Sequence, residues 1–234
     1  MSTPIKRQTT CMKKFFALAL AVTLGFLLLP PLPARAQSAP NAEKSLYLTF
    51  DDGPTDSTTP HVLDVLKEEK VSATVFLIGR QINGREEIVR RIAAEGHAIG
   101  VHTHSHEYKK IYASPAALLK DIALCKKEIL RVLPNTQLTL YRFPGGGFTL
   151  SESLRDAVKK TGLRAVEWNA SVEDAVDPAA NAEKLFQNAV QSAKGKNEVI
   201  LLLHDGVGYR ATVECLPRLI GFFRQEGYVF RKLN

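Results

Sequence analysis

The chain of 234 residues is long enough for one large domain, and its 45% hydrophobic content is sufficient to bury a sizeable core. Its formal net charge of +7 suggests an anionic partner, but five of the basic residues precede residue 37, in a segment without acidic residues. The rest of the chain is nearly neutral, which excludes the strongly basic surface that is typical of nucleic-acid-binding proteins.

The N-terminal segment has the pattern of a secretory signal peptide. A basic stretch that ends at Lys14 precedes the apolar run 15–29, and a small-residue site that ends at Ala36 follows it. The apolar run is shorter than the roughly 20 residues that a membrane-spanning helix usually needs. We therefore expect residues 1–36 to be a signal peptide cleaved after Ala36, with an uncleaved anchor as the alternative. The mature protein is expected to be secreted or to work on the cell-wall side of the membrane.

After a short polar linker, 37–44, strand-like runs alternate with helix-like runs. The predicted strands are 45–50, 73–78, 98–101, 138–142, 164–168, 198–203 and 228–230. The predicted helices are 60–69, 85–95, 115–132, 151–161, 178–193 and 212–226. Two helix starts carry a cap signal followed by proline, namely Ser114 with Pro115 and Asp177 with Pro178.

This alternation predicts an α/β fold in which helices cover parallel strands, either as an open sheet or as a (β/α) barrel. The expected domain is 45–234. In both architectures the side chains that carry out chemistry collect at the carboxyl ends of the strands. Polar residues that directly follow a predicted strand are therefore candidates for a functional site.

Only Cys125 and Cys215 lie beyond the predicted signal peptide, which is too few for a disulfide framework. Both lie at apolar positions of predicted helices. Buried free thiols are therefore the preferred interpretation, with a disulfide between them as the alternative.

Polar or ionisable residues follow five of the predicted strands. They are Asp51, Asp52, His102, His106, Arg142, Trp168, Asn169, His204 and Asp205. Singly, each has a structural explanation, because an Asp-Asp-Gly-Pro stretch is a good turn and two histidines can lie on a surface loop. Their common position at strand ends instead indicates one shared site.

These residues predict metal-assisted hydrolysis. Two imidazoles, from His102 and His106, and one carboxylate form a common ligand set for a catalytic zinc ion, with a fourth position for water. Adjacent aspartates point in different directions, so one can bind the metal while the other takes a proton from the water. Arg142 can hold this base ionised, and His204 can protonate a leaving group.

The chain contains four motifs in this order: TFDDGP (49–54), HTHSH (102–106), RFPGGG (142–147) and LLLHD (201–205). They resemble the motifs of the polysaccharide deacetylases of carbohydrate esterase family 4, the NodB-homology domain, and most of all those of peptidoglycan N-acetylglucosamine deacetylases. The resemblance covers nearly all of 45–234. It implies a distorted (β/α) barrel of about seven parallel strands that forms a single catalytic domain.

The resemblance also implies a role for each matching residue. Asp51 would be the general base and Arg142 would orient it, while His204 would be the general acid. The metal would be zinc or another divalent ion such as Co²⁺ or Ni²⁺. The expected ligands of this metal are Asp52, His102 and His106. His104 lies between two of these ligands in the sequence, but the family does not use it, and we expect it not to bind.

The chain departs from the family pattern at two positions. Gly145 stands where the family has a tyrosine, so the backbone N–H expected to face the oxyanion is kept but an aromatic wall is lost. Ser171 stands near the place of an aspartate that normally tunes the catalytic histidine. Asp174 follows three residues later and is the possible partner of His204. Whether any group pairs with that histidine is therefore left open by the sequence.

Trp168 and Leu202 are expected to wall the acetyl pocket, with a role in the core as the alternative. We expect the enzyme to hydrolyse the N-acetyl group of N-acetylglucosamine residues in a cell-wall glycan, with peptidoglycan preferred, and to release acetate. The alternatives are a deacetylase of chitooligosaccharide or of O-acetylated glycan, and a glycan-binding relative without activity. A phosphatase with an aspartyl nucleophile is disfavoured, because Phe50 stands where its first aspartate is needed. We expect a monomer that binds no nucleic acid and has no membrane span after signal cleavage.

Overall fold

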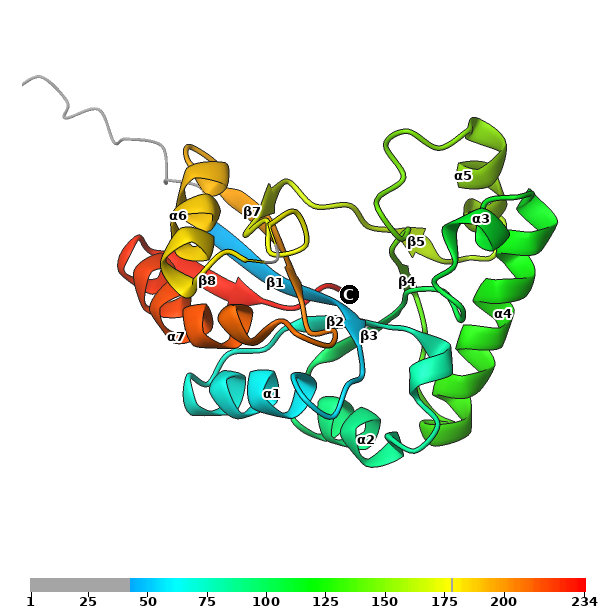
Figure 1. Cartoon of the computed structure of the whole chain (residues 1–234), viewed down its shortest axis with the longest axis horizontal. Coiled ribbons are helices and arrows are strands. Elements are labelled where there is room, and N and C mark those ends of the chain that lie inside the picture. Colours follow the sequence, from blue (N-terminus) through cyan, green and yellow to red (C-terminus); the bar gives the residue numbers. More distant parts are fainter. Residues whose placement is uncertain (1–42, 178) are drawn as a thin grey trace, which may run out of the picture. The chain divides into compact units, whose positions relative to one another are not determined.

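Eight parallel strands form one sheet in the computed structural model, which describes residues 43–177 and 179–234 (Figure 1). The order along the sheet is β5-β4-β3-β2-β1-β7-β6, and β8 pairs with the first half of β1. Within the described residues β5 and β6 do not pair with each other, so the sheet curls into an incomplete barrel. The strands are β1 (Lys44–Gly53), β2 (Thr74–Leu77), β3 (Ala98–Val101), β4 (Leu140–Tyr141), β5 (Arg164–Ala165), β6 (Ala170–Ser171), β7 (Glu198–His204) and β8 (Tyr228–Arg231).

Helices fill most of the connections between strands, and Figure 1 shows them around the outside of the sheet. They are α1 (Thr59–Glu68), the 3₁₀ turn η1 (Gly79–Gln81), α2 (Glu86–Ala94), α3 (Tyr108–Ile111), α4 (Pro115–Val132), α5 (Glu152–Lys159), α6 (Ala182–Ala193) and α7 (Arg210–Gln225). The predicted α/β class, with a distorted barrel of parallel strands, is confirmed.

The central strand β1 separates a helix-covered face from an inner face, because successive side chains of a strand point to opposite sides. Leu46, Leu48 and Phe50 are fully buried in the main hydrophobic cluster. On the opposite side, Thr49 and Asp51 face the interior of the curled sheet. Both faces of a parallel sheet are buried, so a polar residue on the inner face is costly unless it has partners. Polar residues there point to function.

One strand was not predicted from the sequence. The predicted strand 164–168 is shortened to β5, after which the chain crosses to the other end of the sheet. There β6 pairs in parallel with Leu201 and Leu202 of β7. A strand of two residues has no periodicity that a sequence analysis can detect. Its pairing depends on where the chain arrives after the crossing.

The predicted start of helix α6 at Pro178, with Asp177 as its cap, is wrong. The helix begins at Ala182, and the Asn181 side chain accepts a hydrogen bond from the Lys184 N–H at 2.9 Å. Asp177 instead accepts a hydrogen bond from the Ala179 N–H in the preceding turn. Asparagine and aspartate are equally good N-caps, so cap preference alone does not distinguish Asn181 from Asp177.

Helix α4 begins as predicted, because the Ser114 hydroxyl accepts a hydrogen bond from the Ala117 N–H and Pro115 occupies the first turn. Both cysteines of the described chain are free and buried, as the preferred interpretation predicted. Burial raises the pKa of Cys125 and of Cys215 to about 12, so both thiols stay protonated at neutral pH.

The predicted signal peptide, 1–36, and most of the linker lie outside the described residues and stay predictions. The described residues belong to one compact unit. Within 43–177 and 179–234, none of the helices is long and apolar enough to cross a membrane.

The cap of α6 can be tested by a pair of substitutions. Asn181→Ala should lower the free energy of unfolding by about 1 kcal/mol, because an N–H of the first turn loses its acceptor. Asp177→Ala, the matched control, should change it by less than about 0.5 kcal/mol, since this residue is exposed and lies before the helix. Urea unfolding followed by circular dichroism measures both values. The opposite ranking would contradict this assignment of the cap.

Candidate active site

An irregularity in β1 separates the two adjacent aspartates. Asp51 is in register with Phe76 of β2 and with His204 of β7, whereas the register with β2 resumes only at Gly53. The residue between them, Asp52, has a φ of 76°, in the left-handed region that non-glycine residues seldom adopt. This bulge turns Asp52 toward the loop after β3, while Asp51 stays on the inner face.

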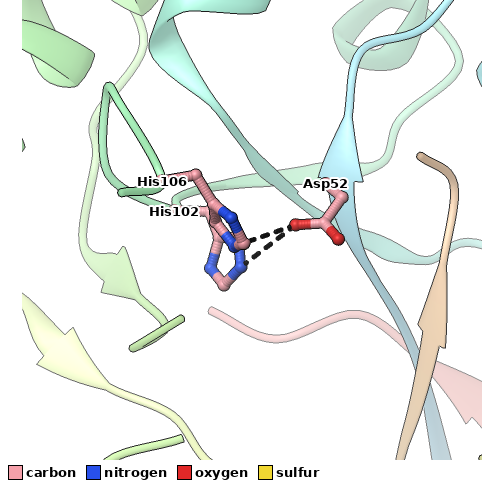
Figure 2. Close-up of side chains that lie close together, drawn as sticks. All are labelled: Asp52, His102 and His106. Carbon is pink, nitrogen blue, oxygen red and sulfur yellow. Dashed lines mark ion pairs between the residues drawn. The ribbon is translucent and has the colours of Figure 1, made fainter. Parts of the chain in front are cut away.

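Three side chains converge beside this bulge, and we call Asp52, His102 and His106 the metal triad (Figure 2). The Asp52 Oδ1 lies 3.1 Å from the His106 Nε2 and 3.6 Å from the His102 Nε2. Ligand atoms at about 2.1 Å from a zinc ion are about 3.4 Å apart in tetrahedral geometry. The spacing of the metal triad therefore fits a divalent metal ion.

The protonation state of His102 also suits a metal ligand. Its Nδ1 lies 2.9 Å from the Arg142 carbonyl oxygen, which can only accept, so this nitrogen carries the proton and Nε2 presents a lone pair to the metal triad. Burial lowers the pKa of His102 to about 3, so the ring is neutral near pH 7. Metals bind the neutral form of imidazole.

Two further features of the metal triad fit a cation. The Asp52 Oδ1 is buried and finds no hydrogen-bond partner among the described residues, a costly arrangement for a carboxylate without a counter-charge. Positive φ values gather here, at Asp52, at Thr103 and at His106. Backbone strain of this kind concentrates at ligand sites, where the geometry of the ligands requires it.

Arg142, the residue that follows β4, is fully buried and holds Asp51. Its Nη1 donates to the Asp51 Oδ1 at 3.1 Å and to the Thr49 hydroxyl at 2.7 Å, and its Nε donates to the Val166 carbonyl at 3.0 Å. Burial raises the pKa of Asp51 above its usual range, although the charge of Arg142 opposes this shift. A raised pKa suits a carboxylate that takes up a proton near neutral pH.

His204, at the end of β7, is held by Asp174. This carboxylate accepts hydrogen bonds from the His204 Nδ1 at 2.7 Å, from its backbone N–H at 2.9 Å and from the Thr212 hydroxyl at 2.8 Å. Burial lowers the pKa of His204, but the hydrogen bond and charge of Asp174, together with the carboxylates of β1, outweigh it and raise the pKa to about 9. The imidazole is therefore protonated at neutral pH, with Nε2 as its free donor.

The loop after β4 carries the predicted oxyanion donor. Gly145 has a φ of 72°, which favours glycine at this position. The residues on either side are tied down, because the Tyr112 hydroxyl donates to the Pro144 carbonyl at 2.7 Å and the Gly147 N–H donates to the Glu167 carboxylate at 2.9 Å. Among the hydrogen bonds of the described residues, none uses the Gly145 N–H.

The two predicted wall residues lie near the inner face. The Trp168 ring is half-buried, 5.8 Å from the Arg142 guanidinium and edge-to-face with Phe148 at 5.6 Å. Leu202 is buried and in register with Thr49, so both point to the interior of the curled sheet. Leu202 belongs to neither of the hydrophobic clusters of the described chain. These positions fit a wall better than the helix-covered core.

Asn169 is not part of the site, and its expected position at the rim is wrong. Its side-chain amide donates to the Glu198 carbonyl and accepts from the Ile200 N–H, both at the beginning of β7. His204 lies at the other end of the same strand. The reason is the short β5, which ends before the chain reaches Asn169.

His104 and Asp205 lie beside the site but point into other contacts. The His104 backbone N–H donates to the Asp121 carboxylate of α4, and its ring packs beside Gly79. The Asp205 carboxylate accepts a hydrogen bond from the Thr59 hydroxyl of α1 at 2.6 Å. Burial raises the pKa of Asp205 to about 7. Neither side chain belongs to the metal triad.

Sequence reasoning missed four side chains that complete the site. Thr49 bonds to Arg142, and the period of two along β1 could have revealed it, because it lies two residues before Asp51 on the same face. For the other three, no periodic pattern along a strand or helix marks the side chain as part of the site. They are Thr212, which bonds to Asp174; Tyr209, which stacks on the His204 ring at 5.1 Å; and Tyr108, which is edge-to-face with the His106 ring at 5.4 Å.

The sequence of the whole chain was also compared with known proteins. A family model described as polysaccharide deacetylase matches residues 38–166. This chain belongs to the polysaccharide deacetylase family. The deacetylase is 34% identical to a peptidoglycan-N-acetylglucosamine deacetylase of Bacillus cereus over 194 residues, which cover 82% of this chain and 87% of the relative. It is 32% identical to a chitooligosaccharide deacetylase of Sinorhizobium fredii over 200 residues, which cover 81% and 90% of the two chains.

Solved structures share the fold of this deacetylase. A CE4 esterase of Streptococcus mutans superimposes with a TM-score of 0.77 at 30% identity, covering 83% of this chain and 87% of that one. The catalytic domain of a peptidoglycan N-acetylglucosamine deacetylase from Eubacterium rectale superimposes with a TM-score of 0.75 at 30% identity, covering 86% and 93%. These findings confirm the family resemblance and the assignment of the chain as a hydrolase.

The metal triad generates a binding prediction that does not depend on activity. Asp52→Asn should weaken Zn²⁺ binding by about 100-fold, because the substitution removes the charged ligand of the set. Isothermal titration calorimetry on protein freed of metal with a chelator measures this affinity. The matched control is Asp56→Asn, which changes an exposed carboxylate four residues away that pairs with Arg85. Equal Zn²⁺ affinity in wild type and Asp52→Asn would rule out this ligand set.

Proposed function

We propose that this polysaccharide deacetylase hydrolyses the N-acetyl group of N-acetylglucosamine residues in a cell-wall glycan, with peptidoglycan as its substrate. One observation carries the proposal: Asp51 and His204 are in register on β1 and β7, beside the metal triad. Hydrolysis of an amide needs one group that takes a proton from water and another that gives a proton to the departing amine. The two strands supply both groups on the same face.

The metal triad would hold the metal, for which we propose zinc, with Co²⁺ or Ni²⁺ as the alternatives. One carboxylate and two imidazoles are a ligand set of catalytic zinc sites. When bound, the metal supplies Lewis-acid activation of the acetyl carbonyl and of a water molecule. The proton transfers and the orientation of the substrate are the work of the protein's own groups.

Asp51 is the proposed general base. Its Oδ1 is occupied by Arg142, whereas its Oδ2 faces the metal triad, 3.8 Å from the His102 Nε2. This leaves Oδ2 to accept the proton of the attacking water. Arg142 is the proposed orienting residue, because its hydrogen bonds to Thr49 and to a backbone carbonyl hold the guanidinium in one place.

His204 is the proposed general acid. Its Nδ1 is held by Asp174, so Nε2 is the nitrogen that gives a proton to the amine as the carbon–nitrogen bond breaks. An amine leaves only when it is protonated, and a pKa of about 9 keeps this donor charged at neutral pH. Asp174 is thus the proposed partner of His204, in place of the aspartate that Ser171 replaces.

The Gly145 N–H is the proposed donor to the oxyanion that forms on the acetyl oxygen. It is free of other hydrogen bonds in the described chain, and its neighbours in the loop are anchored. One such preorganised donor is typically worth about 3 kcal/mol of transition-state stabilisation. Trp168 and Leu202 are the proposed walls around the acetyl methyl group.

Peptidoglycan is proposed as the substrate from two independent indications. The relatives from Bacillus cereus and Eubacterium rectale are named as peptidoglycan N-acetylglucosamine deacetylases. The predicted signal peptide would deliver a secreted enzyme to the cell wall. A chitooligosaccharide deacetylase is the second candidate, because the relative from Sinorhizobium fredii carries that name. A preference for O-acetyl groups is a third outcome that the same assay detects.

The proposed reaction predicts metal-dependent release of acetate. The wild-type enzyme should release acetate from peptidoglycan, lose this activity after chelation and regain it with Zn²⁺. Asp51→Asn should lower kcat by 10² to 10⁴, as is typical for the loss of a general base. An enzyme-coupled acetate assay on peptidoglycan, on N-acetylglucosamine oligomers and on O-acetylated xylan ranks the substrates. Zn²⁺ binding without acetate release from any of them would favour a glycan-binding protein.

The Asp174–His204 pair predicts a change in pH dependence. Activity requires protonated His204, so it should fall as the pH rises through the pKa of this residue. Asp174→Asn removes the interactions that raise that pKa, so the alkaline limb of the kcat profile should move to lower pH by about one unit or more. Asp177→Asn, an exposed carboxylate three residues away, is the control and should leave the limb in place. An unshifted limb in Asp174→Asn would exclude the assigned acid.

A further inference from the structure

Tyr108 lies between the metal triad and the Gly145 loop. Its ring is edge-to-face with the ring of His106, with centroids 5.4 Å apart. A side-chain carbon built on Gly145 would lie 3.0 Å from the Tyr108 Cε1. Despite these contacts, Tyr108 is 48% exposed, which is unusual for an aromatic residue beside a buried site. The exposed part of the ring is available to a ligand.

The position of Tyr108 is coupled to that of the Gly145 loop. Tyr108 begins α3, and Tyr112 directly follows this helix with its ring 6.0 Å from that of Tyr108. The Tyr112 hydroxyl donates to the Pro144 carbonyl, so α3 and the loop are joined by a hydrogen bond. The hydrogen bond and the ring contact together keep Tyr108 beside the Gly145 loop.

Gly145 and Tyr108 share the same space. With a φ of 72°, position 145 is strained for any residue with a side chain, and such a side chain would press against the Tyr108 ring. The glycine thus leaves room for an aromatic ring that comes from α3 instead of from the loop itself. The site therefore has an aromatic ring beside the Gly145 backbone, and this ring is supplied by Tyr108 of α3.

We propose that Tyr108 contacts the sugar that carries the acetyl group and packs its ring against the apolar face of the pyranose. This inference rests on the proposed function and names a specificity-determining residue for it. A pyranose presents C–H groups on its faces, and tyrosine offers a flat apolar ring together with a polar end. The phenolic hydroxyl at this polar end can donate a hydrogen bond to a sugar oxygen.

The test compares a substrate that has a sugar with one that has none. Tyr108→Ala should raise KM for N-acetylglucosamine trimer about tenfold while kcat changes by less than threefold, because the lost contact is made equally in the ground and transition states. Hydrolysis of ethyl acetate, which has an acetyl group but no sugar, should change by less than twofold. Tyr108→Phe should lie closer to the wild type. Lys109→Ala, the next and exposed residue of α3, is the matched control and should match the wild type on both substrates.

A binding measurement separates this inference from the proposed function. In the Zn²⁺-loaded Asp51→Asn protein, which should not turn the trimer over, Tyr108→Ala should weaken trimer binding about tenfold by calorimetry. This result would support the sugar contact even if the wild type released no acetate. Equal trimer affinity with and without Tyr108→Ala would overturn the inference, and so would the absence of trimer binding to the Asp51→Asn protein itself. So would an equal loss on trimer and ethyl acetate, since Tyr108 would then act on the metal triad and not on the sugar.

Discussion

The buried charge pair of Asp51 and Arg142 organises the inner face of the sheet. The two residues are 3% and 0% exposed, and removing two charges from water costs several kcal/mol per ion before their attraction is counted. The guanidinium recovers part of this through Thr49 and the Val166 carbonyl, and it lies 4.3 Å from the Phe76 ring. A hydrophobic pair would fill the same volume without the desolvation cost. Stability alone therefore does not explain why this pair is charged, whereas a role of Asp51 in the chemistry of the site does.

This constraint explains why two like charges can be adjacent. Asp51 stays in the regular register of β1 and faces Arg142, whereas the bulge rotates Asp52 toward the imidazoles of His102 and His106. Each carboxylate thus has its own partners, and their repulsion is divided between a guanidinium and a site suited to a divalent cation. The strained φ of Asp52 is the conformational cost of this divergence. Without the bulge both side chains would follow the pleat, and Asp52 would face the helix-covered side.

A second buried pair, Asp174 with His204, lies on the other side of Asp51. Both pairs combine a carboxylate with a basic side chain that is held in place by hydrogen bonds. They differ in which member of the pair can exchange a proton near neutral pH. Burial raises the pKa of Asp51 while the charge of Arg142 favours its ionised form, whereas Asp174 favours the protonated form of His204, whose pKa is about 9. Groups whose surroundings assign them opposite protonation states are the requirement for acid–base catalysis at one pH. The parallel register of β1 and β7 places them together.

Local patterns in the sequence determined the α/β class, the cap of α4 at Ser114 and the residues that lie at the carboxyl ends of β1, β3 and β7. These features follow from side-chain periods of 2 and 3.6 and from turn chemistry, which involve only neighbours along the chain. The tertiary structure alone decided the strand β6, the pairing of Asp174 with His204 and the placing of Tyr108 against Gly145. Each of these is a contact between distant segments, and it depends on how the connections pack after the strands have paired. A local pattern can specify which face a side chain occupies, but the partner that it meets there is set by the packing of the whole domain.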